Sequence, residues 1–390
     1  MQGICITIQI LEQIHLIAIL LVRTNLNGSS FRLILILLVG HGWNLEEGFK
    51  ENMQTIKRLI IVGNGFDLDH ALNTEYSGFK EYLLNNKYKD VFSLIPSPNY
   101  NHHGKEYFDN DELKCFLFRE IQGDHDDEWK NFEERLGYLD FSENLFSLSE
   151  LGNTDGNEWH DTEDNEDNMT NAFRAFSHLT SYFMEWLNDV VDEYNADTSS
   201  WKTKPSFSRL LNTNTNILDF NYTKTVENLY KFNNVNHIHG TLSDEDIILG
   251  HSHINQPTTE QFLGADDTII ELEQSLYKDT NKIICNNIDF FDNLYDVEEV
   301  YTYGFSFSDV DMPYVAEIIN KISSNATWFL HSSRYEIANE ENYVQKLKNN
   351  DFIGTIKEWL WSFWQIHPFN PLEKNLGPFY KNNPSKTLKE

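Results

Sequence analysis

Short apolar runs, each ending near a glycine or a polar residue, constrain the fold of this chain more than any other feature. They have the length and the β-branched content of buried strands, and residues at helical spacing lie between most of them. The predicted strands are residues 58–62, 215–220, 235–238, 247–249, 300–303 and 327–330. Strands that alternate with helices are typical of a parallel sheet with helices on both faces. We therefore predict an α/β protein with a Rossmann-like, mostly parallel sheet.

The segment between the first two predicted strands has the pattern of a helical insertion, at about residues 70–210. Apolar residues recur there at helical spacing, most strongly between 169 and 191. Residues 150–167 are acidic and contain no lysine or arginine, so we expect a solvated loop there. The expected helices of the insertion and of the later chain are residues 76–84, 113–121, 129–136, 169–191, 314–322 and 343–347.

Residues 1–52 differ from the rest of the chain. They contain apolar runs at 16–22 and 33–39 and few charged residues. Each run is far shorter than the roughly 20 residues that span a bilayer as a helix. We expect an upstream extension with little role in the fold, with a membrane anchor and a packed element as alternatives. The main domain is then residues 53–335, and a helical or irregular segment follows at 336–390, irregular after Pro368.

The net charge of −31 restricts the partners that the chain can bind. Acidic proteins repel nucleic-acid phosphates and anionic lipid headgroups, so we expect neither a nucleic acid nor a membrane as partner. Cys5, Cys115 and Cys285 form no Cys-x-x-Cys pair, which disfavours a zinc site or a disulfide framework. This cysteine content is typical of a cytoplasmic protein. A homo-oligomer remains open.

The first candidate motif is Gly63-Asn64-Gly65-Phe66-Asp67, directly after the first predicted strand. Glycines at this point let backbone amides approach an anion without an intervening side chain. The motif is neither a full Gly-x-Gly-x-x-Gly fingerprint nor a Walker sequence with its lysine. A tight structural turn and a contact with a phosphate or ribose are therefore both consistent with it. Asp67 could accept hydrogen bonds from a ribose or order the loop.

Two further motifs follow the next predicted strands. Asn221 and Tyr222 come at the carboxyl end of the second strand, where ligands of open α/β sheets collect. Asn221 could hold a ribose hydroxyl or a water, or cap the helix that starts near residue 223. His239 lies in His237-Ile-His239-Gly240, and its near-neutral pKa suits a general base. Strand alternation would place His237 and His239 on one face.

Four histidines, at 237, 239, 251 and 253, could suggest a metal, but no carboxylate or cysteine lies at a fixed offset from them. We therefore predict no metal.

The fourth motif, Gly304-Phe305-Ser306, follows the strand at 300–303 and precedes Ser308, Asp309 and Asp311. We expect its backbone amides and the Ser306 hydroxyl to form a second polar end of the pocket. Asp309 and Asp311 could instead cap the next helix. No Gly-x-Ser-x-Gly turn is present, which disfavours a Ser–His–Asp hydrolase.

In combination, these motifs resemble the AbiH family of bacteriophage abortive-infection proteins over about residues 53–335. Ala71 departs from the family pattern, which often has glycine after the histidine, so the turn is expected to be less free. The stretches that carry the resemblance are 63–67 with His70, Leu72, Thr74 and Tyr76; 129–133; 220–223 with Glu227; 238–240; and 304–306 with Asp311.

The layout also resembles, more distantly, sirtuin-like NAD-binding domains. That resemblance implies that Asn221 orients the nicotinamide ribose and a water, and that His239 is the base. It places Asp67 beside the nicotinamide and Ser306 near the adenosine. Residue Thr223 stands where these domains have an aspartate, and their zinc cysteines are absent, which argues against a protein deacetylase. The remaining residues implied as contacts of NAD or a related nucleotide are Gly63, Asn64, Gly65, Phe66, Tyr222, Gly304 and Asp311.

Three functions follow from these resemblances as expectations. The first is a defence enzyme that cleaves NAD or a related nucleotide on infection, in response to a phage-derived protein. The second is a sensor that binds a nucleotide or an ADP-ribose-like signal without turnover. The third is a scaffold that binds a partner through its aromatic helical insertion. Trp129 and Glu133 of the insertion could form a lid, with Glu133 either a second carboxylate of the site or a surface residue.

Overall fold

The computed structural model describes residues 5–10, 17–26, 29–38, 57–84, 95–122, 132–142, 145, 158–244, 247–253, 262–331 and 340–359. Within it, residues 1–55 and 56–390 form two separate compact units. The first contains an antiparallel sheet in the order β1-β2-β3. Its strands are β1 (Cys5–Ile10), β2 (Ile17–Leu26) and β3 (Ser29–Leu38). The expected role of residues 1–52 as an extension stays a prediction, and Trp129 and the tail after Pro368 lie outside the described residues.

The second unit is built on a six-stranded sheet in which every neighbouring pair is parallel. Its order is β11-β10-β9-β4-β7-β8. The chain therefore runs outward from β4 to one edge, returns to β9 beside β4, and continues to the other edge, which is the strand order of Rossmann folds. The strands are β4 (Lys57–Val62), β7 (Thr215–Asp219), β8 (Val235–His237), β9 (Val297–Tyr303), β10 (Thr327–His331) and β11 (Thr355–Trp359).

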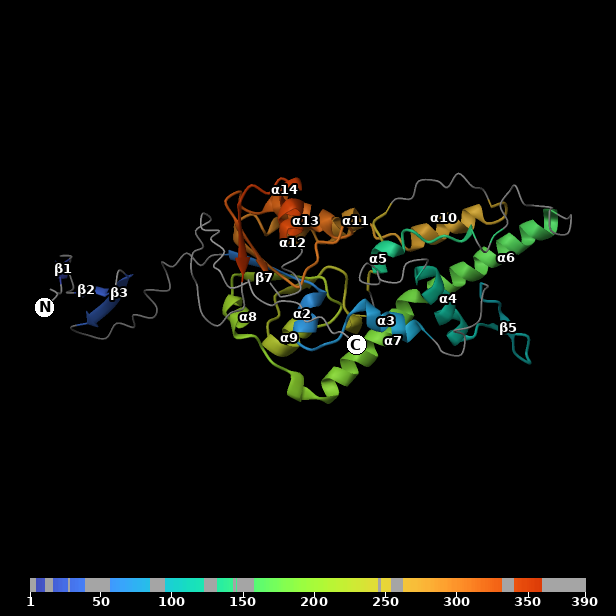
Figure 1. Ribbon diagram of the computed structural model, residues 1–390, viewed down its shortest axis with the longest axis horizontal. Helices are drawn as coiled ribbons and strands as arrows, with labels where there is room; N and C mark the ends of the chain where they lie inside the picture. Colours follow the sequence, from blue (N-terminus) through green and yellow to red (C-terminus); the bar gives the residue numbers. More distant parts are fainter. Residues whose placement is uncertain are drawn as a thin grey trace, which may run out of the picture. The chain divides into compact units, whose positions relative to one another are not determined.

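The central strand β4 shows why the sheet is covered on both faces. Leu59 and Ile61 are fully buried in one core, and Ile60 and Val62 in another. The first core contains side chains from α11 (Thr280–Asn286), α12 (Ile288–Asp292), α13 (Met312–Lys321) and α14 (Glu340–Asn349). The second contains side chains from α2 (Asn64–Asp69), α8 (Pro205–Leu210) and α9 (Thr225–Tyr230), and Figure 1 shows the two groups of helices. The predicted α/β fold with helices on both faces is confirmed.

Two strand predictions are corrected by the structure. Residues 247–249 form no strand, because among the described backbone bonds this segment meets its neighbour through one contact, from the Ile248 amide to the His239 carbonyl. Conversely, β11 lies in the segment predicted to be helical or irregular. It is an edge strand on which Lys357 and Glu358 are both exposed, so it lacks the continuous apolar run of the inner strands.

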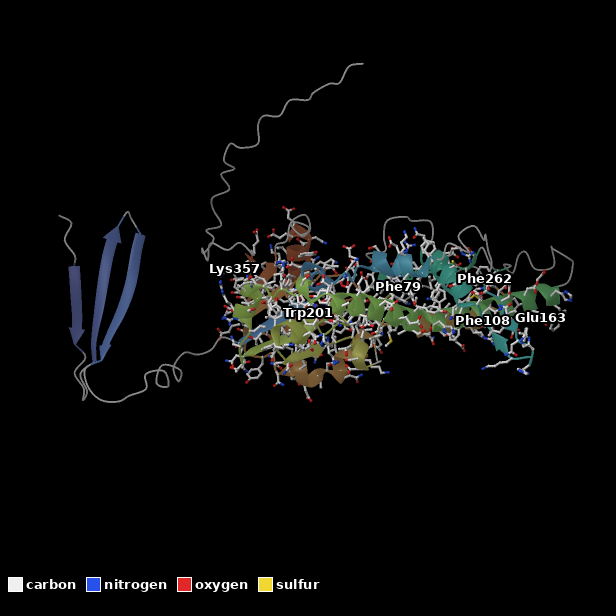
Figure 2. The ribbon with its side chains drawn as sticks, turned by 90° about the horizontal axis from the view of Figure 1, so that it is seen from below. Phe79, Phe108, Glu163, Trp201, Phe262 and Lys357 are labelled. Carbon is white, nitrogen blue, oxygen red and sulfur yellow. The ribbon has the colours of Figure 1, made fainter. Side chains whose placement is uncertain are left out.

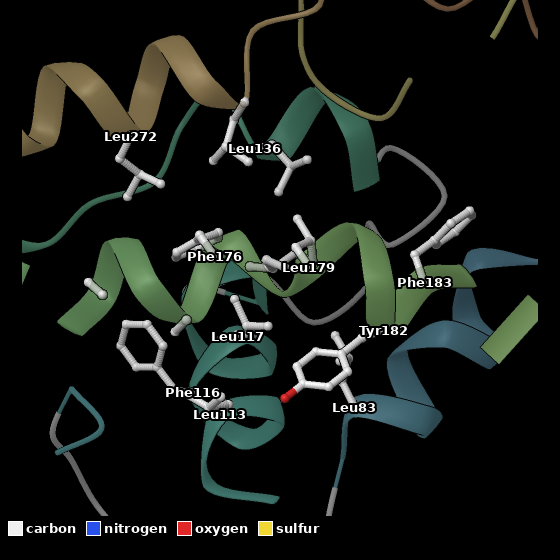
Figure 3. Packing of buried hydrophobic residues seen from close by; sticks show 14 of the residues in the cluster. Leu83, Leu113, Phe116, Leu117, Leu136, Phe176, Leu179, Tyr182, Phe183 and Leu272 are labelled. Carbon is white, nitrogen blue, oxygen red and sulfur yellow. The ribbon is translucent and has the colours of Figure 1, made fainter. Parts of the chain in front are cut away.

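The insertion between β4 and β7 is mainly helical, as predicted, and has its own core, which Figure 3 shows from close by. In Figures 1 and 2 the insertion extends to one side of the sheet, with its Phe79 and Phe108 labelled in Figure 2 beside Phe262 from later in the chain. Helix α10 (Asp266–Ser275), from later in the chain, packs on α6 (Glu158–Ser177). Besides α8, the elements of the insertion are α3 (Tyr76–Leu83), β5 (Asn99–Tyr100), β6 (Glu106–Tyr107), α4 (Asn110–Gln122), α5 (Phe132–Arg135), α6 (Glu158–Ser177), α7 (Leu179–Ala196) and the 3-10 helix η3 (Thr198–Ser200).

The acidic segment predicted as a loop is helical from its ninth residue onward, because α6 begins at Glu158. Two of its polar residues, Asp161 and Asn165, are buried at helical spacing, and Asn165 Nδ2 donates to the Leu263 carbonyl. The acidic composition concealed this buried stripe. The long helix predicted from 169 to 191 is also two helices, which separate at His178. Among the described residues, no helix has the length and apolar character needed to cross a membrane.

Candidate functional site

A cavity of about 800 Å³ lies at the carboxyl ends of the central strands, and we call it the strand-end cavity. Its volume is within the roughly 300–1,000 Å³ of typical small-molecule sites. It lies where the strand order reverses between β4 and β9, the position at which open α/β sheets bind ligands. All the predicted site residues except Phe66 line it, namely Gly63, Asn64, Gly65, Asp67, Asn221, Tyr222, His239, Gly304, Ser306 and Asp311.

Glycines 63 and 65 are required by the contact between the loops after β4 and β9. A Cβ on Gly63 would lie 2.6 Å from the Gly304 carbonyl oxygen, and a Cβ on Gly65 would lie 2.7 Å from the Gly304 Cα. Gly304 has a φ of +64°, which glycine adopts without strain. The amides of Gly63 and Gly65 donate to the carbonyls of Tyr303 and Gly304. The tight structural turn is therefore present, and a contact with phosphate or ribose stays a prediction.

Phe66 lies outside the cavity lining, with its ring fully buried and 4.2 Å from the ring of His70 between centroids. His70 contacts the Phe66 carbonyl through Nδ1 at 2.7 Å and the Tyr230 hydroxyl through Nε2 at 2.6 Å. The carbonyl can only accept, so the ring proton is on Nδ1. Burial lowers the pKa of His70 to about 4. The buried ring of Phe66 and the contacts of His70 therefore stabilise the turn after β4.

Asn221 is held on three sides just after β7. Its backbone amide donates to Asp219 Oδ1 at 2.8 Å, and its side-chain Nδ2 donates to the Gly63 carbonyl at 3.2 Å. Its carbonyl accepts from His237 Nδ1 at 3.1 Å. Helix α9 begins only at Thr225 and has no side-chain cap bond, so the alternative that Asn221 caps it is wrong. Asn221 instead connects the loop after β7 to the glycine turn.

Asp67 is 1% exposed, although it lines the cavity. Its Oδ2 accepts from the Thr223 hydroxyl at 2.6 Å, and its Oδ1 has no hydrogen-bond partner among the described residues. Burial raises the pKa of Asp67 to about 6, against the opposing effect of the Thr223 and Thr225 hydroxyls. Thr223, the departure from the sirtuin-like pattern, therefore supports this carboxylate.

His239 is 3% exposed and lines the cavity from the segment after β8. Its Nε2 lies 3.3 Å from the Tyr314 hydroxyl and 3.9 Å from Asp311 Oδ1. Burial, together with the positive charge of Lys278, lowers the pKa of His239 well below its usual value. The ring is therefore neutral at pH 7.

Asp311 lies beside His239, at the N-cap position of α13, but forms no side-chain cap bond there. Ser308 donates to its Oδ2 at 2.8 Å, and its buried Oδ1 has no partner in the part of the chain that the structure describes. Burial raises the pKa of Asp311 to about 6, while the charge of Lys278 opposes the rise. The predicted second polar end of the pocket is therefore not one continuous surface. Ser306 is exposed, whereas Asp311 lies beside His239.

The loop after β9 contains a strained residue, Phe307, with a φ of +52°. Bulky side chains rarely adopt this conformation, and such strain persists only where surrounding contacts enforce it. The ring of Phe307 is fully buried against Phe305 and Tyr343, and its carbonyl accepts from Lys346 Nζ at 2.7 Å. The loop that lines the cavity is therefore held in its shape from the side of α14.

Glu133 and Lys278 form a buried ion pair that the sequence reasoning only partly identified. Glu133, on α5, lines the cavity and accepts from the Tyr76 hydroxyl at 2.8 Å, so it is not a surface residue. Lys278 has a fully buried side chain that contacts the Glu133 carboxylate. Nothing in the local sequence distinguishes Lys278 from a surface lysine, because its partner lies far away in the chain.

His237 and His239 do not share one face, contrary to the strand-alternation prediction, because β8 ends at His237. His237 instead lines a separate groove of about 540 Å³ with Lys224, Glu227 and Asp244. Its Nε2 contacts Glu227 Oε1 at 2.8 Å. In the described ranges, no three histidine, cysteine or carboxylate residues are grouped to hold a metal ion.

Comparison with known proteins gives one family. A family model described as "Bacteriophage abortive infection AbiH" matches residues 59–332, more than half of the chain. The matched range begins in β4 and includes every residue described above that lines the strand-end cavity, except those of α14. No curated protein and no solved structure gives a match.

Proposed function

The chain belongs to the AbiH family of bacteriophage abortive-infection proteins, and from this premise we propose that its strand-end cavity binds NAD and hydrolyses it on infection. The observation that carries the proposal is the meeting of Asn221, a neutral His239 and Asp311 in one cavity at the switch point of a Rossmann-type sheet. The likeness to sirtuin-like domains is an analogy of layout and adds the choice of NAD.

The reaction would break the bond between C1′ of the nicotinamide ribose and the pyridinium nitrogen. The electron pair leaves with nicotinamide, which becomes neutral, and a water oxygen forms the new bond to C1′. The water loses one proton, and the products are ADP-ribose, nicotinamide and H⁺. Such a centre passes through a cationic, oxocarbenium-like transition state, as glycosidases do.

The charges of the cavity suit a cationic centre. Asp67, Glu133 and Asp311 all line it, and preorganised charges of opposite sign stabilise a transition state most where water is excluded. Asn221 would orient the ribose or the water, and His239 would accept the proton with Asp311 beside it. The pyrophosphate would lie toward Lys80 and Lys346, the lysines of the lining.

The test is to measure NAD, nicotinamide and ADP-ribose by mass spectrometry in infected cells that produce the full chain. We expect NAD to fall and ADP-ribose to rise with the wild type, and both to stay unchanged with Asn221→Ala. Asn325→Ala, which changes an exposed turn residue, is the matched control and should behave as the wild type. Protection against phage by the wild type without loss of NAD would refute the proposal.

A second candidate function is a sensor that binds the nucleotide without cleaving it. The strained Phe307 favours it, because strained backbone clusters at switch segments and ligand binding against this loop could change its shape. The purified full chain should then melt at a higher temperature with NAD or ADP-ribose, following mass action, while the NAD concentration stays constant.

A further inference from the structure

The two ring nitrogens of His237 both face oxygen atoms, and both of these oxygens only accept hydrogen bonds when Glu227 is ionised. Nδ1 lies 3.1 Å from the Asn221 carbonyl oxygen, and Nε2 lies 2.8 Å from a carboxylate oxygen of Glu227. A neutral imidazole has one N–H and could satisfy only one of them. With Glu227 ionised, both contacts are hydrogen bonds only if the ring carries a second proton.

We propose that His237 is held as an imidazolium by Glu227 and, in this charged form, positions Asn221 for the strand-end cavity. His237 does not line that cavity and is a positioning residue. Its charged Nδ1–H fixes the Asn221 carbonyl, while Asp219 fixes the Asn221 amide. With the backbone held from both sides, the side-chain amide is directed to the Gly63 carbonyl at the cavity wall.

The charges around His237 favour the imidazolium. Glu227 faces it from α9, Asp219 from β7, Asp67 from α2 and Asp244 from the 3-10 helix η4 (Leu242–Asp244), and Lys224 is the cation of the same groove. Burial raises the pKa of Asp219 well above its usual value, so the Glu227 hydrogen bond contributes most to the charge of His237. Buried oxygens of three of these carboxylates have no hydrogen-bond partner among the described residues, namely Asp67 Oδ1, Asp219 Oδ2 and Glu227 Oε2. A cation at His237 offsets the cost of burying them.

Burial alone would lower the pKa of His237, but the Glu227 hydrogen bond and the charges of Asp219 and Glu227 raise it to about 9. The imidazolium is therefore present at neutral pH and is lost as the pH rises through about 9. At that point the Asn221 carbonyl or Glu227 loses its donor. The position of Asn221 should change with the same midpoint.

The experiment is NMR on the full chain, with ¹⁵N-labelled histidine and ¹³C-carbonyl-labelled asparagine. His237→Gln identifies the His237 signals, and Asn221→Ala the Asn221 carbonyl. We expect both His237 nitrogens to be protonated at pH 7.5 and the Asn221 carbonyl shift to follow the ring titration. Glu227→Gln keeps an acceptor oxygen but removes the charge, and should lower the midpoint by about 1–3 pH units. Glu317→Gln on α13 is the control and should leave it unchanged.

A neutral His237 ring at pH 7.5 in the wild type would overturn the proposal, and so would an Asn221 carbonyl shift that does not move with the ring. A second measurement, the pH profile of ADP-ribose formation from NAD, tests whether His237 positions Asn221 during catalysis. Only this measurement rests on the proposed function. We expect its alkaline limb to move to lower pH in Glu227→Gln with KM unchanged. If the wild type forms no ADP-ribose, the proposed function fails while the NMR result still decides the charge of His237.

Discussion

His237 and His239 are two residues apart, yet the regions around them impose opposite charge states. The Glu227 hydrogen bond and nearby carboxylates overcome the effect of burial at His237 and raise its pKa to about 9. Burial and the ammonium of Lys278 lower the pKa of His239 well below its usual value. The end of β8 separates them, so that one ring faces the acidic groove and the other the strand-end cavity. Charges from remote segments, not residue type, decide the chemistry of each histidine.

Among the substitutions that test this difference in pKa, Lys278→Met should have the largest effect. The ammonium is fully buried, and its removal leaves the Glu133 carboxylate without its cation. Breaking one partner of a buried pair costs about 3–5 kcal/mol, so we expect the free energy of unfolding in urea to fall by about that amount. His239 should also become easier to protonate, which makes the two histidines more alike.

Two controls test the assignment to the buried pair. Lys321→Met removes a lysine whose partner Asp292 is exposed, and should change stability little. Adding Glu133→Gln to Lys278→Met should restore part of the loss, because the unpaired charge is removed. A Lys278→Met protein as stable as the wild type would contradict a buried pair of Lys278 and Glu133.

The positions of the inner strands and of the cavity residues could be predicted from the sequence, whereas the charge states of the two histidines could not. The inner strands were predictable because burial on both faces leaves an uninterrupted apolar run, as in Leu59–Val62. Asn221 and His239 were predictable as cavity residues because they directly follow strands whose carboxyl ends meet at one edge. The edge strand β11 was missed because its charged residues are exposed, and 247–249 was wrongly predicted because it is an apolar loop beside a core.

The chemical state of the site could not be predicted from local sequence. Lys278 reaches Glu133 from a distant part of the chain, and Glu227 reaches His237 from a helix before the strand. The spacing of the two histidines suggested a shared face and one role. Only the three-dimensional arrangement separates a cationic positioning residue from a neutral cavity residue.

The pH dependence of stability should separate the two histidines further. The raised pKa of His237 stabilises the folded chain, fully so below the unfolded value of 6.5, and this contribution is lost as the pH rises through about 9. The stability lost in His237→Gln should therefore be on the order of 3 kcal/mol near pH 6 and much smaller near pH 10. Urea unfolding of wild type and variant across this range measures it. A loss that does not vary with pH would show that His237 is neutral.

Asp67→Asn tests the same difference between the two histidines by removing one of the carboxylates near His237. The pKa of Asp67 is raised to about 6, so its ionised form costs stability, and this cost appears as the pH rises from about 4 to about 6. We expect the variant to be about 2–3 kcal/mol more stable than the wild type above pH 6 and no more stable near pH 4, because asparagine still accepts from Thr223. The pKa of His237 should fall, since one neighbouring negative charge is lost. Equal effects at both pH values would count against a buried, ionised Asp67.

The smallest expected effect is that of Ala71→Gly, which should change the free energy of unfolding without involving a titrating group. Ala71 is exposed and has a φ of +64°, a conformation that costs a residue with a Cβ about 1–2 kcal/mol and costs glycine little. Glycine loses more chain entropy on folding, which offsets about 0.4–1 kcal/mol of the gain. The variant should therefore be about 0.5–1 kcal/mol more stable, and equally so from about pH 6 to pH 10, because the preceding His70 has a pKa of about 4 and stays neutral in this range. A pH-dependent gain in urea unfolding would mean that His70 titrates with the other histidines, and the contrast between His237 and His239 could then not be read from stability alone.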